Sequence, residues 1–384
     1  MSITREQELF VSVLADHLNG RKSEKPADDV DLKQLYVVSA KQSLAGMVYF
    51  QLQDYIPVEY IHRYRTAFRS DYYLFDQRKA VMKDISKAMT KQGIEHLYFK
   101  GCQIARRYPM HALRTMGDVD IAVKPKDMEK ADAVMMSFDC EKKIDNPDVY
   151  TYKKWFFDVE LHSHIFYEKL LRGFDYKKYF DGVWEHCAGG KIDDSFHFIY
   201  LVAHTAKHIV NGGCGFRQIS DLAVCLPHID TDYVRKELKK IGLLAFAESM
   251  LDFARRAFGI SIPFGEGRVG DELYGEIAGM LFDGTFGKTE KEGPEVLAAQ
   301  MKHSGGSSVG AAFTLTLRRI FPSYSNMWYV EQYSFLKGKP WLLPVGWVYR
   351  WFYLLFHREN VQSVSSSDLA PAAQKNLFFA KIGL

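Results

Sequence analysis

Cysteine is scarce in this chain of 384 residues, and its spacing excludes two classes of protein. The five cysteines are an odd number, and no two of them form a C-x-x-C pair. Disulfide-rich secreted domains and cysteine-based zinc sites need paired or closely spaced cysteines. We therefore predict reduced thiols and a cytoplasmic protein without zinc.

Long apolar runs are also lacking. The most apolar segment, residues 341–356, contains Pro344 and Arg350 and is shorter than the roughly 20 apolar residues that span a bilayer. We predict no transmembrane segment, and a core or docking helix after Pro344. Contact with a membrane surface through the Trp and Tyr side chains of this segment is the alternative.

No charge of one sign dominates. The chain has 50 basic and 47 acidic residues, which leaves a net charge of +3. Such a small charge gives no long-range attraction for nucleic acid, so nucleic acid is not an expected partner. The first residues, MSITREQELFVSVLADHLNG, mix charged side chains into an apolar helical period, which is typical of an amphipathic helix and not of a secretion signal.

The chain has enough apolar material for more than one core. Hydrophobic residues make up 47% and charged residues 25%, as in ordinary soluble proteins. Helical periodicity dominates residues 1–92 and 191–320, short strands occupy 93–190, and an aromatic-rich helical extension covers 321–384. Glycine-rich stretches within 282–295 and 303–310 predict loops. We predict an α+β fold with a small mixed β-sheet flanked by N- and C-terminal helical regions.

The central block reads as short strands around one helix. The segments EHLYF, DVDIAV and FFDVELHSH have strand character, and CEKKID and VYTYKK read as two more strands. Pro125 starts a helix directly after DVDIAV.

Two aspartates stand where a buried strand normally carries apolar residues. In DVDIAV, Asp118 and Asp120 share one face, while Val119 and Ile121 point to the other. Two anions this close repel each other unless they face water, a cation or a hydrogen-bond donor. We expect either the solvated face of an edge strand or a metal site, and we expect the removal of both aspartates to leave stability unchanged or raised.

A later strand supplies a third carboxylate. In FFDVELHSH, Asp158, Glu160, His162 and His164 alternate with apolar residues. If this strand neighbours DVDIAV with its polar face aligned, three acidic side chains converge, which suits Mg²⁺. We choose Glu160 as the third carboxylate, although the spacing does not separate it from Asp158.

Gly101 lies where a strand meets a helix. EHLYF ends at Lys100 and Gly101, and CQIARRY after it has helical character. Unpaired N–H groups at the start of a helix hold a phosphate well, and Lys100 is near enough to help. An ordinary turn glycine is the alternative.

One helix carries a polar stripe that we expect to be cationic or nearly so. Polar side chains recur in HFIYLVAHTAKHIVN at three- and four-residue spacing: His197, Tyr200, His204, Lys207, His208 and Asn211. The stripe is either a solvated face or the wall of a ligand cleft. A zinc site on His204 and His208 lacks an evident third ligand. On the next helix, Arg217 and Asp221 are expected to pair with each other or with the first helix.

Together these segments resemble a known family. Strand–glycine–helix, then h-D-x-D-h on a strand, then h-[DE]-h on a later strand is the signature of nucleotidyltransferases of the DNA polymerase β superfamily. FKGCQIARRYP, GDVDIAV, VELH and LVAHTAKH followed by FRQISDLAV look more closely like a bacterial family of uncharacterised nucleotidyltransferases. By order of segments, the resemblance covers roughly residues 20–360. It implies a palm-like nucleotidyltransferase core and a following helical domain that closes the nucleotide cleft.

The resemblance also implies the catalytic residues. Asp118, Asp120 and Glu160 would hold two Mg²⁺ ions, and Gly101 would lie beside the triphosphate of an NTP. Many superfamily members have Gly or Ser at the position of Cys102, so the phosphate contact here would come from a backbone N–H, with Lys100 compensating for the missing hydroxyl.

The remaining nucleotide-binding residues follow from the same resemblance. Lys207 would neutralise triphosphate charge, and His204 and His208 would hydrogen-bond to nucleotide or acceptor oxygens. Arg114 would either brace the carboxylates or touch phosphate.

The implied reaction is transfer of a nucleoside monophosphate from an NTP to an acceptor hydroxyl, with release of pyrophosphate. Asp120 or Glu160 would take the acceptor's proton. The acceptor is a sugar, a small hydroxylated compound, a protein side chain or an RNA end, and the small net charge disfavours RNA. The alternatives are a catalytically weak or inactive nucleotide-binding scaffold on the same fold and a peripheral membrane protein.

Overall fold

The computed structural model describes residues 3–154, 157–211, 213–283, 320–324, 327–328, 330–356 and 369–384. The loop expected within 303–310, and all but the first two residues of the loop expected within 282–295, lie outside these ranges.

Four helices form the N-terminal region, as predicted. Their bounds are α1 (Arg5–Leu18), α2 (Leu32–Lys41), α3 (Ala45–Leu52) and α4 (Val58–Lys91). Side chains at two N-termini explain where these helices begin. Thr4 and Gln7 form a capping box ahead of α1, and the Asp31 carboxylate accepts backbone N–H groups at the start of α2.

A five-stranded mixed sheet follows, and all five predicted strands are present. The strands are β1 (His96–Tyr98), β2 (Asp118–Val123), β3 (Glu141–Asn146), β4 (Val149–Lys154) and β5 (Phe157–His162). Their order in the sheet is β1-β2-β5-β4-β3. β2 and β5 pair in parallel and the other neighbours pair antiparallel. Two short helices connect the strands: α5 (Gly101–Ile104) and, just after Pro125, α6 (Met128–Met136).

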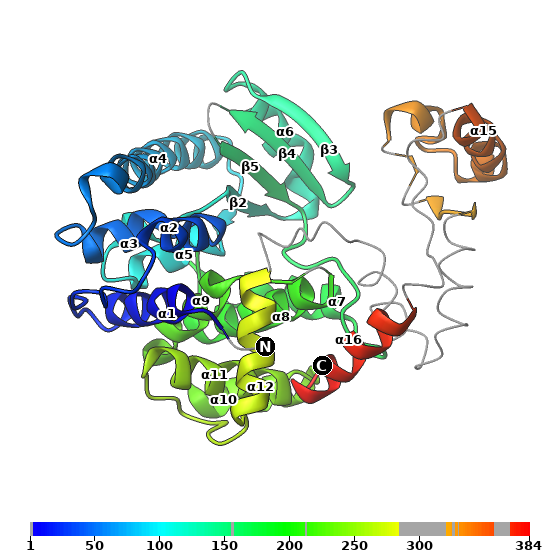
Figure 1. The fold of residues 1–384 in the computed structure, drawn as a ribbon. Coiled ribbons are helices and arrows are strands. Elements are labelled where there is room, and N and C mark those ends of the chain that lie inside the picture. Colours follow the sequence, from blue (N-terminus) through cyan, green and yellow to red (C-terminus); the bar gives the residue numbers. More distant parts are fainter. Residues whose placement is uncertain are drawn as a thin grey trace.

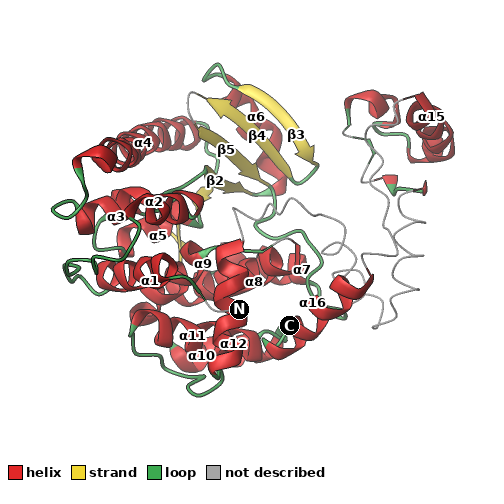
Figure 2. Ribbon diagram, in the orientation of Figure 1, coloured by secondary structure: helices red, strands yellow, loops and turns green. Residues whose placement is uncertain are grey.

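The two faces of the sheet differ in chemistry. Apolar side chains from β2 and β5 pack with residues of α4 and α6 in one hydrophobic cluster, which includes Val119, Ile121, Val159 and Leu161. Figure 2 shows these two helices on the same side of the sheet. Because strand side chains alternate, the acidic residues of β2 and β5 face the other way, toward the second helical region.

The second helical region closes over the acidic face. Its helices are α7 (Tyr176–Phe180), α8 (Asp194–Asn211), α9 (Phe216–Cys225), α10 (Thr231–Lys240), α11 (Leu244–Phe258) and α12 (Asp271–Asp283). A two-stranded ribbon of β6 (Cys187–Ala188) and β7 (Lys191–Ile192) precedes α8.

Helices from the two ends of the chain share one large core. Residues of α1, α3, α8, α9 and α11 belong to the same hydrophobic cluster, with Phe10 of α1 packed edge-on against Phe216 of α9. The C-terminal helix α16 (Leu369–Lys381) joins this cluster through Phe379. In Figure 1 both chain termini lie beside these helices. Helices α1 and α3 before the sheet and helices α8, α9 and α11 after it therefore share one core, whereas Val81, Ile85 and Met89 of α4 pack on the apolar face of the sheet.

The apolar segment near the C-terminus forms helix α15 (Leu343–Phe356). Its neighbours Met327, Tyr333 and Leu336 form a small hydrophobic cluster of their own. Large apolar side chains of the helix remain exposed, with Val345 at 55% and Phe352 at 59%, so it is not a core helix. No helix of the described residues is long and apolar enough to cross a membrane.

Candidate active site

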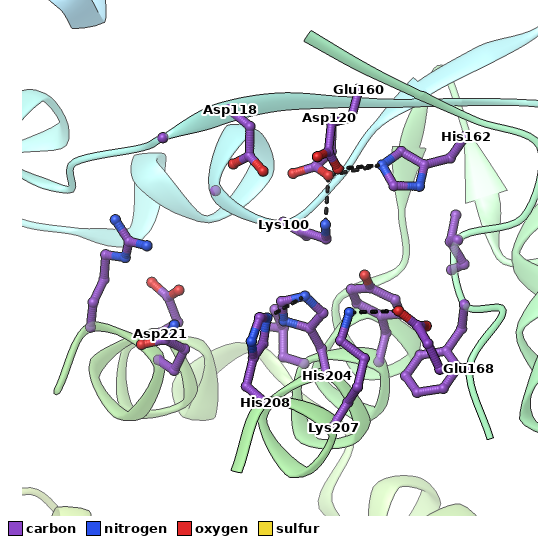
Figure 3. A pocket seen from close by; sticks show the side chains of 18 of the residues that line it. Lys100, Asp118, Asp120, Glu160, His162, Glu168, His204, Lys207, His208 and Asp221 are labelled. Atoms are coloured by element: carbon purple, nitrogen blue, oxygen red, sulfur yellow. Dashed lines mark hydrogen bonds and ion pairs between the residues drawn. The ribbon is translucent and has the colours of Figure 1, made fainter. Parts of the chain in front are cut away.

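A cavity of about 440 Å³ lies between the acidic face of the sheet and helices α8 and α9. Figure 3 shows the side chains of its two walls pointing toward one another. The sheet wall carries Asp118, Asp120, Asp158 and Glu160, and the helical wall carries Tyr200, His204, Lys207 and His208 of α8 with residues of α9. The cavity therefore brings together the acidic strands and the polar stripe.

Strand register places the carboxylates side by side. Asp118 is paired with Asp158, and Asp120 with Glu160, across the parallel β2–β5 ladder. Residues directly opposite on neighbouring strands have side chains only about 5 Å apart. The expected convergence of Asp118, Asp120 and Glu160 is therefore present, and Asp158 joins the same lining.

Asp120 is the most buried carboxylate of the group, with 2% of its surface exposed. Its Oδ1 accepts hydrogen bonds from Lys100 Nζ at 2.6 Å and from His162 Nε2 at 3.0 Å. Burial alone would raise the pKa of Asp120, but these two partners outweigh it and hold the pKa at about 2. Asp120 is therefore ionised throughout the physiological range.

Asp118 has the opposite electrostatic environment. The charge of Asp120 and burial raise the pKa of Asp118 to about 6, although Lys100 opposes the shift. Asp118 thus carries a negative charge at neutral pH against the repulsion of its neighbour. A cation that entered the cavity beside it would relieve this repulsion.

His162 is a site residue that the sequence analysis did not select. Its Nε2 lies 3.0 Å from Asp120 Oδ1 and 3.2 Å from Glu160 Oε2. Burial lowers the pKa of His162, but its hydrogen bonds to the two carboxylates outweigh burial and raise it. The alternation in FFDVELHSH puts His162 on the face of Glu160, and this signal was sufficient to find it.

Ligand atoms of Asp120, Glu160 and His162 all lie within 4.8 Å of one another, a spacing that fits a single metal ion. However, His162 Nδ1 is buried and has no hydrogen-bond partner among the described residues. A histidine that binds a metal through Nε2 normally donates its Nδ1 hydrogen to an acceptor. The arrangement therefore favours Nε2–H as a donor that orients the two carboxylates, and leaves carboxylate oxygens as the metal ligands.

The side chain of Lys100 binds the Asp120 carboxylate and is not free to contact a phosphate. Its backbone has φ +51°, which is rare for a residue other than glycine and costs roughly 1–3 kcal/mol. The backbone N–H of Lys100 donates to His197 Nε2 at 3.1 Å. Burial lowers the pKa of His197 to about 4, so this ring is neutral and can accept.

Gly101 begins α5 directly after the β1 turn, at the predicted junction, and it lines the cavity. A Cβ at this position would overlap Nη1 of Arg114 and lie 2.8 Å from Cγ of Met116. The glycine is therefore required by close packing of Arg114, whether or not a phosphate also approaches it.

Arg114 binds a carboxylate of helix α9 and not the carboxylates of β2 and β5. Its Nη2 lies 2.5 Å from Asp221 Oδ2 and its Nε lies 3.0 Å from Asp221 Oδ1. The Tyr108 hydroxyl donates to the same carboxylate at 2.7 Å. Asp221 thus bonds to the loop before β2, contrary to the expectation that it would pair with Arg217 or α8. Arg217 Nη1 donates to the carbonyl of Thr115 at 3.1 Å.

Cys102 does not join the cavity lining. Its side chain packs against the hydrophobic cluster on the other face of the sheet. Burial raises the pKa of Cys102 to about 12, so it is a thiol at neutral pH. The turn after Gly101 carries the side chain of residue 102 toward the core, and the expected phosphate contact through its backbone N–H stays a prediction.

Of the α8 stripe, Tyr200, His204, Lys207 and His208 line the cavity, and the stripe is not cationic over most of its length. Nε2 of His204 and Nε2 of His208 lie 3.2 Å apart. Burial lowers the pKa of His208 to about 3 and the pKa of His204 well below its usual value, so both rings are neutral. Lys207 is paired with Glu168 at 2.9 Å, and this cation is therefore already compensated.

Six carboxylates and four cations line the cavity: Asp118, Asp120, Asp158, Glu160, Glu168 and Asp221 against Lys100, Arg114, Lys207 and Arg217. With His204 and His208 neutral, and without any charge on His162, this lining carries an excess of two negative charges. It attracts divalent cations and repels a free triphosphate.

Comparison with known proteins agrees with this geometry. A family model described as uncharacterised nucleotidyltransferase matches residues 28–259, more than half of the chain, which includes all the cavity-lining residues. No curated protein and no solved structure matches the chain. The chain belongs to the family of uncharacterised nucleotidyltransferases.

Proposed function

We propose that this protein transfers a nucleoside monophosphate from an NTP to an acceptor hydroxyl, with release of pyrophosphate and with Mg²⁺ as cofactor. The observation that carries the proposal is the in-register parallel pairing of β2 and β5. It sets Asp118 and Asp120 beside Glu160 on one wall of a cavity of about 440 Å³.

The donor set suits a hard divalent cation. Asp118, Asp120 and Glu160 offer carboxylate oxygens, the ligands that Mg²⁺ prefers. Asp118 has a pKa raised to about 6 by its neighbour, so an added cation stabilises its ionised form. When bound, two such ions would neutralise phosphate charge and lower the pKa of the acceptor hydroxyl.

Side chains of the cavity would bind the metal, accept the proton and orient the carboxylates. Asp120, with a pKa of about 2, is a weak base and serves as a ligand. The side chain of Glu160 is 29% exposed and lines the cavity, and Glu160 is our choice to accept the proton of the acceptor hydroxyl. The Nε2–H group of His162 lies between the carboxylates of Asp120 and Glu160 and orients both of them.

The helical wall receives the nucleotide. The ammonium group of Lys207 has three N–H donors, so it can bind phosphate oxygens of the substrate while it stays paired with Glu168. His204 and His208 are neutral, so each has one nitrogen that donates and one that accepts, which suits hydroxyl and base atoms better than phosphate. Gly101 provides close backbone approach on the opposite side.

A catalytically weak nucleotide-binding scaffold is the second candidate. The observation that favours it is the ion pair of Lys100 with Asp120, since this cation sits on a proposed ligand oxygen. In this case the protein would bind an NTP with Mg²⁺ and turn it over slowly or not at all.

Transfer of radiolabel separates these candidates. The protein is incubated with Mg²⁺, one α-labelled or γ-labelled NTP, and a panel of sugars, polyols and Ser- or Tyr-containing peptides. Nucleotidyl transfer moves the α-label to the acceptor and releases the γ-label in pyrophosphate. Calorimetric binding of an NTP without any transfer supports the scaffold, and absence of both binding and transfer contradicts the proposed function.

Contact of residues 341–356 with a membrane surface stays a prediction. Exposed Trp341, Val345 and Phe352 supply the apolar side chains that such contact needs. Flotation of the protein with anionic liposomes tests it, and absence of the protein from the lipid fraction contradicts it.

A further inference from the structure

The ammonium group of Lys100 lies where a metal ion bound to Asp120 Oδ1 would lie. This group lies 2.6 Å from Asp120 Oδ1, within the group of carboxylates proposed as ligands. Asp118 and Glu160 also contribute to the negative field around this ammonium group. Figure 3 shows the Lys100 side chain pointing at the Asp120 carboxylate from below the sheet. The site thus contains a cation supplied by the chain itself.

The backbone holds Lys100 there at a cost. A positive φ of +51° is unusual for lysine, and a neutral buried His197 accepts the backbone N–H at 3.1 Å. Glycine would adopt this conformation without strain, and the next residue is already a glycine. The position therefore retains a lysine side chain against the local conformational preference, which points to a role for its charge.

Oδ1 of Asp120 already accepts two hydrogen bonds, from Lys100 and from His162, so a divalent ion can bind this oxygen only if one of these partners leaves. A lysine nitrogen at 2.6 Å already fills the approach to Asp120 Oδ1, and two cations at such separations repel strongly. The four-carbon side chain of Lys100 is flexible and 16% exposed, so it can leave Asp120 for the cavity. Lys207 does not compete in this way, because it binds Glu168 on the opposite wall.

We propose that Lys100 is an exchangeable cation: it neutralises Asp120 while the site lacks metal, and a divalent ion displaces it toward the cavity, where it binds the triphosphate. The displacement step needs only the carboxylates as ligands for a divalent ion. The second position of Lys100 rests on the proposed nucleotide function. Lys100 thereby couples metal entry to phosphate binding.

Metal binding without nucleotide tests the displacement. Mn²⁺ is titrated into the wild-type chain and into Lys100→Met, and free Mn²⁺ is measured by electron paramagnetic resonance. We expect Lys100→Met to bind Mn²⁺ at least about tenfold more tightly, because the competing cation is gone. An equal or lower affinity would overturn the proposal.

Lys207→Met is the matched control, because it removes the same charge from the opposite wall of the same cavity. We expect its Mn²⁺ affinity to rise by less than about threefold, since Asp120 remains occupied by Lys100. An increase equal to that of Lys100→Met would mean that only net cavity charge matters, and would contradict direct exchange. Lys100→Arg, which keeps a cation at Asp120, is expected to bind Mn²⁺ weakly, like the wild type.

Acylation of the wild-type chain keeps the proposal testable if Lys100→Met fails to fold. Labelling of Lys100 by an amine-reactive ester is followed by mass spectrometry with and without Mn²⁺. We expect faster labelling with Mn²⁺, because the displaced amine leaves its carboxylate partner. Unchanged or slower labelling would overturn the exchange.

Nucleotide binding gives a separate readout for the second position of Lys100. With saturating Mn²⁺, we expect Lys100→Met to bind an NTP at least about tenfold more weakly than the wild type, through the loss of one phosphate contact. If the chain bound Mn²⁺ by displacement of Lys100 but bound no NTP, the proposed function would fail while the exchange stood. If NTP transfer occurred but Mn²⁺ affinity did not respond to Lys100, the reverse would hold.

Discussion

Asp118 and Asp120 lie two positions apart on one strand, yet their pKa values are shifted in opposite directions, to about 6 and about 2. The difference arises from their partners. Asp120 accepts hydrogen bonds from Lys100 and His162, whereas the main influence on Asp118 is repulsion by the charge of Asp120. The two carboxylates therefore contribute to stability with opposite signs.

Single substitutions should separate these contributions. We expect Asp118→Asn to raise the free energy of unfolding at pH 7 by up to about 2 kcal/mol, because it removes an opposed charge. We expect Asp120→Asn to lower it by about 3 kcal/mol, because it leaves the Lys100 ammonium group buried without its anion. Urea denaturation measures both values.

The predicted loss of stability in Asp120→Asn differs from the prediction made from the sequence. Removal of both aspartates was expected to leave stability unchanged or raised, and the burial of Lys100 on Asp120 now predicts a loss from the second substitution. Equal effects of the two single substitutions would contradict the assigned partners.

The pH dependence of stability should reveal Asp118. Its pKa is raised on folding, so its proton stabilises the native state below about pH 4, and this contribution is lost as pH rises through about 6. We expect the unfolding free energy of the wild type, relative to Asp118→Asn, to fall across this window and then stay constant. A flat difference from pH 4 to pH 7 would show that the pKa of Asp118 is not raised.

Metal affinity should change over the same pH range in the opposite sense. Ligand carboxylates must be deprotonated, so Mn²⁺ binding is expected to strengthen by up to about tenfold per pH unit below pH 6 and to level off above it. Calorimetry at several pH values measures this slope. Binding that is independent of pH between 5 and 7 would mean that Asp118 is not a ligand.

The two glycines of the cavity should respond differently to alanine. A methyl group at Gly101 would overlap Arg114, whereas a methyl group at Gly117 would meet no atom within 4 Å. We expect Gly101→Ala to lower the free energy of unfolding by about 1–3 kcal/mol and Gly117→Ala to change it by less than about 1 kcal/mol. Similar values for both would argue against close packing of Arg114 on Gly101.

The buried ion pair of Arg114 with Asp221 should be structural. Asp221→Ala leaves a guanidinium group buried without its partner, and we expect a loss of about 3–5 kcal/mol. The double variant Arg114→Met with Asp221→Leu should recover much of this loss, because neither charge remains. A double variant less stable than Asp221→Ala would mean that the two residues contribute independently.

The sequence predicts the acidic wall because strand periodicity is local. Asp118, Asp120 and Glu160 each alternate with apolar residues, which is enough to assign them to polar strand faces. The parallel pairing of the two strands depends on tertiary packing and does not follow from either segment alone. His162 follows from the same alternation, but histidine is not among the oxygen ligands that Mg²⁺ prefers, so its residue type did not point to this site.

The carboxylate partners of the lysines and arginines could not be predicted from the sequence. Lys100 meets Asp120, Arg114 meets Asp221 and Lys207 meets Glu168 only after the elements pack together. The polar stripe of α8 has helical spacing whether it faces water or a cavity, and burial in the packed structure makes its histidines neutral. Cys102 likewise faces the core because of a turn whose direction the residue types do not determine.

The central claim is that β2 and β5 hold divalent ions beside a nucleotide, and one crystallographic measurement tests it most directly. Crystals of the wild-type chain grown with Mn²⁺ and a non-hydrolysable NTP would be examined by anomalous diffraction. We predict manganese peaks in contact with Asp118, Asp120 and Glu160, triphosphate density alongside, and Lys100 displaced from Asp120. Absence of manganese from these carboxylates, with Lys100 still bound to Asp120, would contradict the account.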